Sequence, residues 1–122
     1  MLDVWGSLKN VQQTVQAHLA WIKARKSFER VFAVDFEMAY SDFRVVQMAL
    51  QLAGEMALLK RYTTAYSAIY NYEHAYVQGG LEEFNRQYGE KLADYEQTVV
   101  TLEQIIKEIG ALLPEDDASN LV

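Results

Sequence analysis

Residues 88–113, YGEKLADYEQTVVTLEQIIKEIGALL, carry the clearest periodic pattern in the chain. Their apolar positions alternate spacings of four and three residues, which is typical of a helix that packs along one seam. The seam consists of Tyr88, Leu92, Tyr95, Val99, Leu102, Ile106, Ile109 and Leu113. Ile105 and Leu112 make it wider than the seam of a two-stranded coiled coil, so the pattern predicts a bundle of three or more helices.

Helical periodicity extends over most of the remaining chain. From Ser7, a residue suited to cap a helix N-terminus, apolar residues recur at helical spacing as far as Ile22. Segment 35–78 contains no proline, and its apolar residues form two faces instead of one. A helix that is apolar on two faces is normally buried between neighbours, so we expect this segment to be central in the fold.

Strong helix breakers fall at two places, the tandem Gly79-Gly80 and the single proline, Pro114. They separate the central segment from a last helix and end that helix. A helix could also restart at Ser41 or Thr63, within the central segment. The sequence therefore predicts an all-α fold, an elongated antiparallel helical bundle of three long or four shorter helices.

The composition favours one soluble domain. The chain has 122 residues, of which 51% are hydrophobic, and it contains no cysteine. A core of this size needs no disulfide or metal to fold, and no apolar run approaches the ~20 residues of a membrane span. We expect a single helical domain over residues 1–113, a poorly ordered acidic tail over 114–122, no membrane association and a cytoplasmic location.

The charge distribution is uneven. The net charge of −6 argues against direct nucleic-acid binding, which needs lysine and arginine to replace counterions of the phosphate backbone. Residues 1–30 nevertheless carry five basic side chains against two acidic ones. Four of the basic residues, Lys23, Arg25, Lys26 and Arg30, fall within eight positions and are a candidate docking site for an acidic partner. The alternative is a solvated charged face.

The stretch 61–76, RYTTAYSAIYNYEHAY, is rich in tyrosine and places Glu73 on the tyrosine face of a helix. A carboxylate in that position must be hydrogen-bonded or paired, and we expect tyrosine hydroxyls, Arg86 or Lys91 to do so. The candidate polar core or pocket comprises Tyr66, Tyr70, Glu73, Tyr76, Tyr88 and Tyr95. It could be a partly wet core, a small-molecule pocket or a tyrosine-rich surface for a protein partner.

A second apolar face of the central segment is rich in methionine. It consists of Met38, Val45, Met48, Leu52, Met56 and Leu59. It could be buried under another helix, or it could be an interface for self-association or for a partner, because methionine repacks easily.

Known catalytic and metal motifs are absent from the sequence. No glutamate is followed by histidine three residues later, as a di-iron bundle requires, and the two histidines, His18 and His74, make a weak ligand set. The chain lacks a Gly-rich phosphate loop, a Gly-x-Ser-x-Gly elbow and any cysteine nucleophile. We therefore predict no catalytic residues, no metal and no cofactor.

The apolar surface exceeds what one short bundle readily covers, because the central segment has two apolar faces. The sequence thus favours a non-catalytic protein-interaction module, an adaptor, inhibitor or assembly subunit that forms homo-oligomers. One alternative is a ligand-binding bundle or small enzyme centred on Glu73 and the tyrosines. Another is an acidic regulator that occupies the nucleic-acid-binding surface of a partner.

Overall fold

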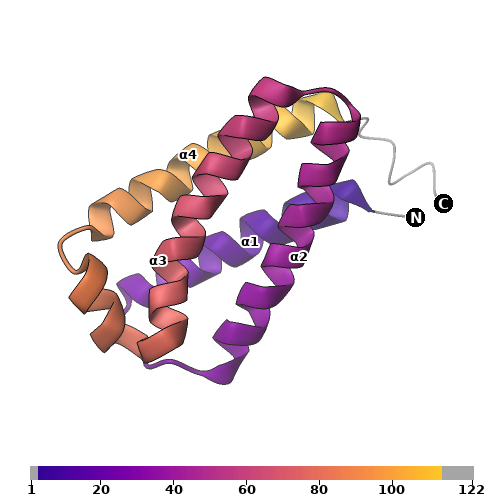
Figure 1. Cartoon of the computed structure of the whole chain (residues 1–122). Helices are drawn as coiled ribbons and strands as arrows, with labels where there is room; N and C mark the ends of the chain where they lie inside the picture. Colours follow the sequence, from indigo (N-terminus) through magenta and orange to yellow (C-terminus); the bar gives the residue numbers. More distant parts are fainter. Residues whose placement is uncertain (1–2, 114–122) are drawn as a thin grey trace.

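The computed structural model describes residues 3–113 and is all-α, which confirms the predicted fold class. It has four helices and not three (Figure 1). They are α1 (Val4–Lys23), α2 (Arg30–Leu52), α3 (Met56–Tyr88) and α4 (Leu92–Leu112). The predicted acidic tail, 114–122, lies outside the described residues.

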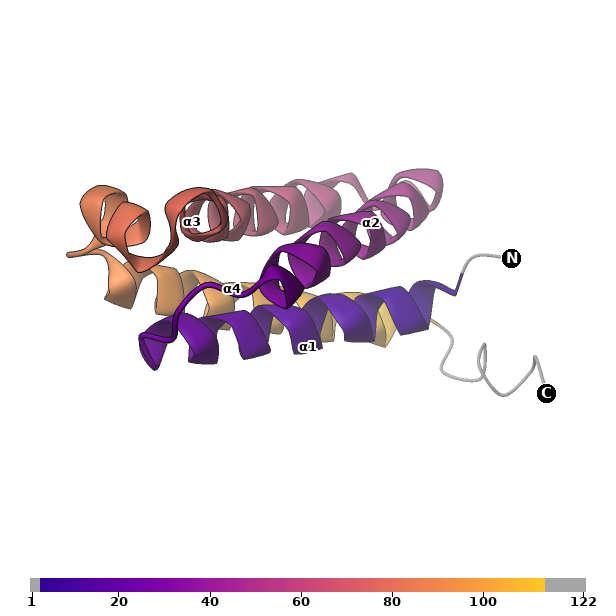
Figure 2. The same ribbon diagram turned by 90° about the horizontal axis from the view of Figure 1, so that it is seen from below.

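Consecutive helices run antiparallel and form two layers, α2 with α3 over α1 with α4 (Figure 2). Each helix packs mainly on two others, so α1 contacts α2 and α4, while α3 contacts α2 and α4. Apolar residues from all four helices meet in one core cluster. Within residues 3–113, no helix is both long enough and apolar enough to cross a membrane.

The first helix begins earlier than the sequence indicated. Asp3 is its N-cap, and the Asp3 carboxylate accepts a hydrogen bond from the Gly6 amide at 2.8 Å. Ser7, predicted as the cap, instead lies inside α1, where its hydroxyl donates to Asp42 of α2 at 2.9 Å. Asp3 caps the helix in place of Ser7 because it also offers a side-chain oxygen, and its negative charge is favourable at a helix N-terminus.

The central segment is divided by Gly54, a break that the sequence analysis missed. Gly54 has a φ of 74°, and the amide of Glu55 reaches back to the carbonyl oxygen of Leu50 at 3.0 Å. This geometry is a Schellman cap, which ends a helix with one left-handed residue. The α1–α2 loop has the same cap with Arg25 in the left-handed position, at a φ of 55°.

The tandem glycines interrupt the helical backbone, as predicted: Gly79 and Gly80 both have non-helical φ and ψ, so α3 consists of two helical segments joined at a kink. Gly80 combines a φ of 65° with a ψ of −154°, a conformation open only to glycine, and residues 81–88 continue as the last turns of α3. The chain then turns through Gly89 to Lys91, and α4 begins at Leu92. The predicted last helix is therefore two segments, and Tyr88 belongs to α3. The remaining seam residues of α4 are buried or partly buried, whereas Leu112, expected to widen the seam, is half exposed.

Candidate functional site

A buried carboxyl group, that of Glu73 on α3, lies at the centre of the bundle. Glu73 is 3% exposed, and its side chain takes hydrogen bonds from two other helices. His18 Nδ1 of α1 lies 2.8 Å from Glu73 Oε1, and the Tyr95 hydroxyl of α4 donates to Glu73 Oε2 at 2.9 Å. The one carboxyl group thus joins α1, α3 and α4.

Burial dominates the electrostatics of this cluster. It raises the pKa of Glu73, because the charged form loses hydration, while the hydrogen bonds from His18 and Tyr95 act in the opposite direction. Burial and the adjacent carboxyl group also raise the pKa of Tyr95, so its hydroxyl stays protonated and remains a donor. The result is a compact hydrogen-bonded group in which each buried polar atom has a partner.

Aromatic rings cover this polar centre. The His18 ring stacks on Phe32 of α2, with 3.7 Å between ring centroids, so all four helices contribute to the cluster. One turn along, the Trp21 indole donates to the Tyr76 hydroxyl at 2.7 Å, and that hydroxyl donates to the Lys26 carbonyl oxygen at 2.7 Å. Tyr76 therefore fixes the α1–α2 loop against α3.

The burial and the tyrosine partner of Glu73 agree with the sequence analysis, but the cationic partners it named are wrong. Arg86 forms an ion pair with Glu83 instead, and Lys91 is exposed at the start of α4. His18 was missed, although it shares the apolar stripe of α1 with Val15 and Ile22, and that position was a signal of burial. Arg86 lies beyond the kink at Gly79-Gly80, in the last turn of α3.

The six candidate residues of the tyrosine set do not form a single site. Only Tyr95 contacts the carboxyl group of Glu73 by a hydrogen bond, and Tyr76 belongs to the adjacent Trp21 contact. Tyr88 packs edge-on against Tyr72, beside the α3–α4 turn. The remaining two, Tyr66 and Tyr70, line a hollow between α2 and α3.

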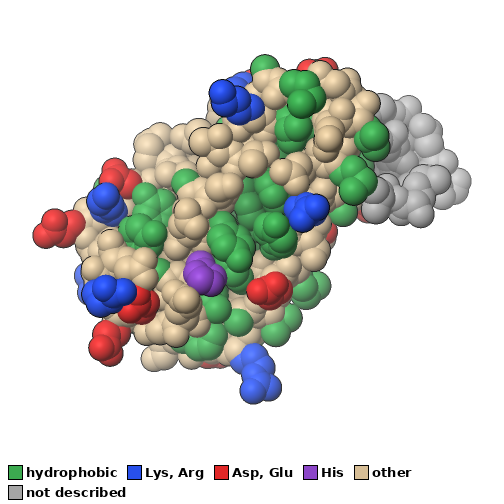
Figure 3. Space-filling model, viewed as in Figure 1, with side chains coloured by type: hydrophobic (Ala, Val, Ile, Leu, Met, Phe, Trp, Pro, Cys, Tyr) green, Lys and Arg blue, Asp and Glu red, His purple; other side chains and the backbone are tan. Residues whose placement is uncertain are grey.

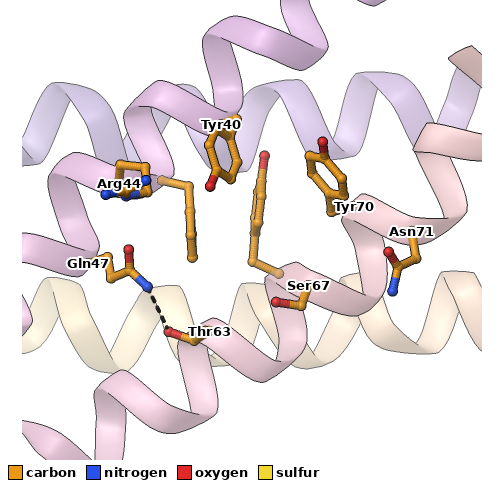
Figure 4. A pocket seen from close by; sticks show the side chains of 9 residues that line it. Tyr40, Arg44, Gln47, Thr63, Ser67, Tyr70 and Asn71 are labelled. Carbon is orange, nitrogen blue, oxygen red and sulfur yellow. Dashed lines mark hydrogen bonds between the residues drawn. The ribbon is translucent and has the colours of Figure 1, made fainter.

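This hollow is open to solvent and has a volume of about 550 Å³ (Figure 4). Its α2 wall carries Tyr40 and Arg44, and the α3 wall carries Tyr66 and Tyr70. The Gln47 amide donates to the Thr63 hydroxyl across it at 3.4 Å. The other lining residues are Phe43, Ser67 and Asn71. Arg44 is the one charged residue in this lining, so the hollow combines aromatic walls with a positive charge.

Glu73 lines neither this hollow nor the other cavities described over residues 3–113. The hydrogen-bonded cluster of His18, Glu73 and Tyr95 is thus separate from any small molecule that the hollow could hold. In this arrangement the cluster connects α1, α3 and α4 by hydrogen bonds. The side chains that are exposed and could bind a partner lie on other parts of the molecule.

The outward face of α2 is apolar at every position but one, Ser41. The positions on this face alternate spacings of three and four residues: Val31, Val34, Met38, Ser41, Val45, Met48 and Leu52. Met38 is 60% exposed and Leu52 is 82% exposed. In Figure 3, hydrophobic side chains follow α2 along the margin of the molecule. We call these seven positions the α2 seam.

The seam lies roughly opposite the helix face that faces the core. The core face of α2 consists of Phe32, Phe36, Ala39, Phe43, Val46 and Leu50. Because 100° separates successive residues, the centre of the seam lies roughly 150° around the helix from the centre of the core face. Within residues 3–113 no other helix covers Met38 and Leu52, so α2 has one partnered and one unpartnered apolar face.

The residues predicted to form one methionine-rich face lie on two different helices in the structure. Met38, Val45, Met48 and Leu52 lie on the α2 seam, but the break at Gly54 places Met56 and Leu59 on α3. Leu59 is partly buried and packs against the core, while Met56 is exposed at the first residue of α3. Val31 and Val34, which the sequence analysis did not include, extend the face toward the start of α2.

The basic cluster surrounds the α1–α2 loop, and all four of its residues are exposed. Lys23 forms an ion pair with Glu96 of α4 at 2.5 Å, and the Lys26 ammonium group lies 5.2 Å from the centre of the Trp21 ring. Arg25 and Arg30 take part in no ion pair within residues 3–113. Two of the four residues, Lys23 and Lys26, therefore make contacts within the chain.

Metal binding finds no ready site in the described part of the chain, because residues 3–113 contain no group of three histidine, aspartate or glutamate side chains placed to hold an ion. Comparison of the chain with protein-family models, curated proteins and solved structures gives no match.

Proposed function

We propose that this chain is a non-catalytic protein-interaction module that self-associates through the α2 seam. The observation that carries the proposal is the heptad spacing of apolar residues on the outward face of α2, of which five are about half exposed or more, with Ser41 as the one polar position. A surface helix normally has one apolar stripe, directed at the core, and polar residues elsewhere. A second stripe with coiled-coil spacing is typical of a helix that packs on another helix.

The energetics agree with this reading. Complete burial of a fully exposed valine, leucine or methionine side chain contributes roughly 1.5–3 kcal/mol, and at least about half of that can still be gained from each of five seam side chains, which are about half exposed or more. Left in water, they would form an aggregation-prone patch. A protein partner that covers them removes this cost.

Sedimentation equilibrium tests the proposal directly. The wild-type chain should associate at micromolar concentration, and Met38→Glu, which places a charge in the middle of the seam, should raise the dissociation constant at least tenfold. Val100→Glu is the matched control, because Val100 is half exposed on α4, away from the seam. A wild-type monomer at several hundred micromolar would remove self-association from the proposal.

A second candidate function is the binding of a small anionic aromatic molecule in the hollow between α2 and α3. The observation that favours it is the Arg44 guanidinium, which lies near the Tyr40 ring and forms no ion pair within residues 3–113, in a volume typical of ligand sites. This alternative involves Tyr66 and Tyr70 of the tyrosine set, but it does not involve Glu73.

Benzoate and benzamide, which have the same ring but differ in charge, provide the probe pair for this hollow. Benzoate should shift the amide NMR signals of Thr63 and Ser67 at millimolar concentration, and benzamide should shift them less. Arg44→Ala should remove the difference between the two probes, since it removes the positive charge. Equal shifts with both probes in the wild type would contradict this candidate.

The third reading, an acidic regulator at a nucleic-acid-binding surface, has less support. Several surface carboxylates are neutralised within the chain, as in the ion pairs Glu83–Arg86 and Glu108–Arg61. Such pairs interrupt the continuous negative surface that imitation of a nucleic acid needs. It stays a prediction of the sequence.

A further inference from the structure

Resting on the proposed function, we infer that the occupant of the α2 seam is a second copy of this chain, packed antiparallel, with Glu37 of each copy beside Arg44 of the other. The seam runs from Val31 to Leu52, about 32 Å at the rise of an α-helix. A symmetric pair needs one self-complementary surface, and a straight apolar helix face is such a surface.

The size of the seam suits a dimer. Its five most exposed apolar side chains together present on the order of 500 Å² per copy, near the upper limit for the largest patch of a typical monomer. Two copies would hide about 1,000 Å² through these side chains alone, close to the lower limit of roughly 1,200 Å² for a specific interface. The aliphatic parts of flanking residues supply the difference.

The charges beside the seam distinguish the two possible orientations. Along one edge, Arg30, Glu37, Arg44 and Gln51 recur every seven residues, and Asp35, Asp42 and Ala49 follow the other edge. If Met38 packs opposite Ser41 of an antiparallel copy, Glu37 lies beside Arg44 of that copy, and symmetry repeats the pair. Both side chains are exposed, and neither forms an ion pair within residues 3–113.

The aspartate edge does not select an orientation. In the antiparallel pair Asp35 lies near Asp42 of the second copy, and in a parallel pair Glu37 lies near that same Asp42. The Asp42 carboxylate already accepts a hydrogen bond from the Ser7 hydroxyl of its own chain, which reduces the repulsion between carboxylates in both orientations. A parallel pair also gains one attraction, between Arg30 and Asp35.

The ends of α2 decide for the antiparallel pair. The basic cluster of Lys23, Arg25, Lys26 and Arg30 lies at the N-terminal end of α2, so a parallel pair would bring two such clusters together. An antiparallel pair places each cluster near the C-terminal end of the other α2, where the helix dipole is negative and Glu55 follows. Charge repulsion thus disfavours one orientation, and attraction favours the other.

Disulfide trapping tests the orientation, because the natural chain has no cysteine. Two variants, Val31→Cys and Met48→Cys, are mixed in equal amounts, oxidised with copper phenanthroline and weighed as intact dimers by mass spectrometry. In the antiparallel register Val31 packs opposite Met48 of the other copy, so the mixed disulfide should exceed its statistical half of the dimers. Val100→Cys on α4 is the control, and it should not cross-link with either variant.

Each outcome has a separate meaning. Predominance of the Val31→Cys and Met48→Cys homodimers would overturn the antiparallel orientation and leave self-association intact. A wild-type chain that sediments as a monomer, with no cross-link in the mixture, would overturn the inference together with the proposed function.

A charge exchange tests the pair of side chains itself. Glu37→Arg and Arg44→Glu should each raise the dissociation constant about 3- to 10-fold, since each places like charges together twice in the dimer. The double variant, Glu37→Arg with Arg44→Glu, should recover the wild-type value within about twofold. A double variant as weak as the single variants would overturn the Glu37–Arg44 pairing.

Discussion

His18 Nδ1 and Glu73 Oε1 lie 2.8 Å apart in the centre of the bundle, although 55 positions separate the two residues in the chain. Both side chains are almost fully buried, and the Tyr95 hydroxyl completes the set of partners around the carboxyl group. Because the carboxyl group of Glu73 is buried and has partners, its removal, its neutralisation and a change of pH should each affect the stability of the fold differently.

Removal of the carboxyl group should cost more than its neutralisation. Glu73→Ala leaves His18 Nδ1 and the Tyr95 hydroxyl without a partner beside a new cavity, and should lower the free energy of unfolding by about 3 kcal/mol. Glu73→Gln keeps the shape and one acceptor, and should cost about 1–2 kcal/mol at neutral pH. Urea unfolding followed by circular dichroism measures both. Equal losses in the two variants would mean that packing alone matters at this position.

Neutralisation should also change how stability depends on pH. Because burial raises the pKa of Glu73 above the ordinary 4.5, the folded chain binds this proton more tightly than the unfolded chain. The contribution is fully present below about pH 4.5 and is lost as the pH rises through the raised pKa. Glu73→Gln has no such loss, so its free energy of unfolding relative to the wild type should rise from pH 4 to pH 8.

A second background provides the control for this pH dependence. Tyr95→Phe removes a hydrogen bond that lowers the pKa of Glu73, so the loss of stability should move to higher pH. If the difference between Glu73→Gln and the parent stays constant with pH in both backgrounds, the pKa of Glu73 is not raised.

Local periodicity explains what could be predicted from the sequence. The faces of a helix follow from its own residues, so the seam of α4 and the burial of Glu73 were both predictable. The partners of Glu73 were not, because His18 comes from another helix and the packing of α1 on α3 is set by the whole bundle. The α2 seam was partly predictable, through Met38 and Leu52, because exposure depends on which neighbours are present.

The helix ends were the least predictable part. The break at Gly54 depends on one residue in the left-handed conformation and on the two backbone hydrogen bonds that follow it. A single glycine in an apolar helical pattern is weak evidence for a helix end, whereas two consecutive glycines are strong evidence for one. The tandem glycines do interrupt α3, and the chain continues beyond them as a second helical segment over 81–88, which buries Phe84 and packs on the core.

The two Schellman caps make a matched pair of tests for backbone strain. Arg25→Gly should stabilise the fold by about 0.5–1 kcal/mol, since glycine adopts a φ of 55° without strain. Gly54→Ala should destabilise it by about 1 kcal/mol through the backbone alone, since an added Cβ there meets no atom within 4 Å. Thermal unfolding measures both changes. A stabilising Gly54→Ala would contradict the left-handed cap at that position.

The basic cluster should influence association more than folding. We expect charge reversal of Arg25 and Arg30, which form no ion pair within residues 3–113, to weaken self-association. It removes their attraction to the C-terminal end of the other α2, where the helix dipole is negative and Glu55 follows. The dissociation constant should rise about 5-fold at low salt, and the effect should shrink at 0.5 M salt, where the Debye length falls below roughly 5 Å.

Lys23→Glu separates the two roles of the basic cluster. It breaks the ion pair with Glu96 across α1 and α4, so it should lower the thermal stability slightly, by less than about 1 kcal/mol because the pair is exposed. Arg25→Glu with Arg30→Glu should leave the melting temperature within about 2 °C of the wild type. Sedimentation at two salt concentrations and calorimetry on the same samples measure both effects. An unchanged dissociation constant in the Arg25 and Arg30 double variant would mean that these side chains are only a solvated face, and the antiparallel pair would lose the attraction between its ends.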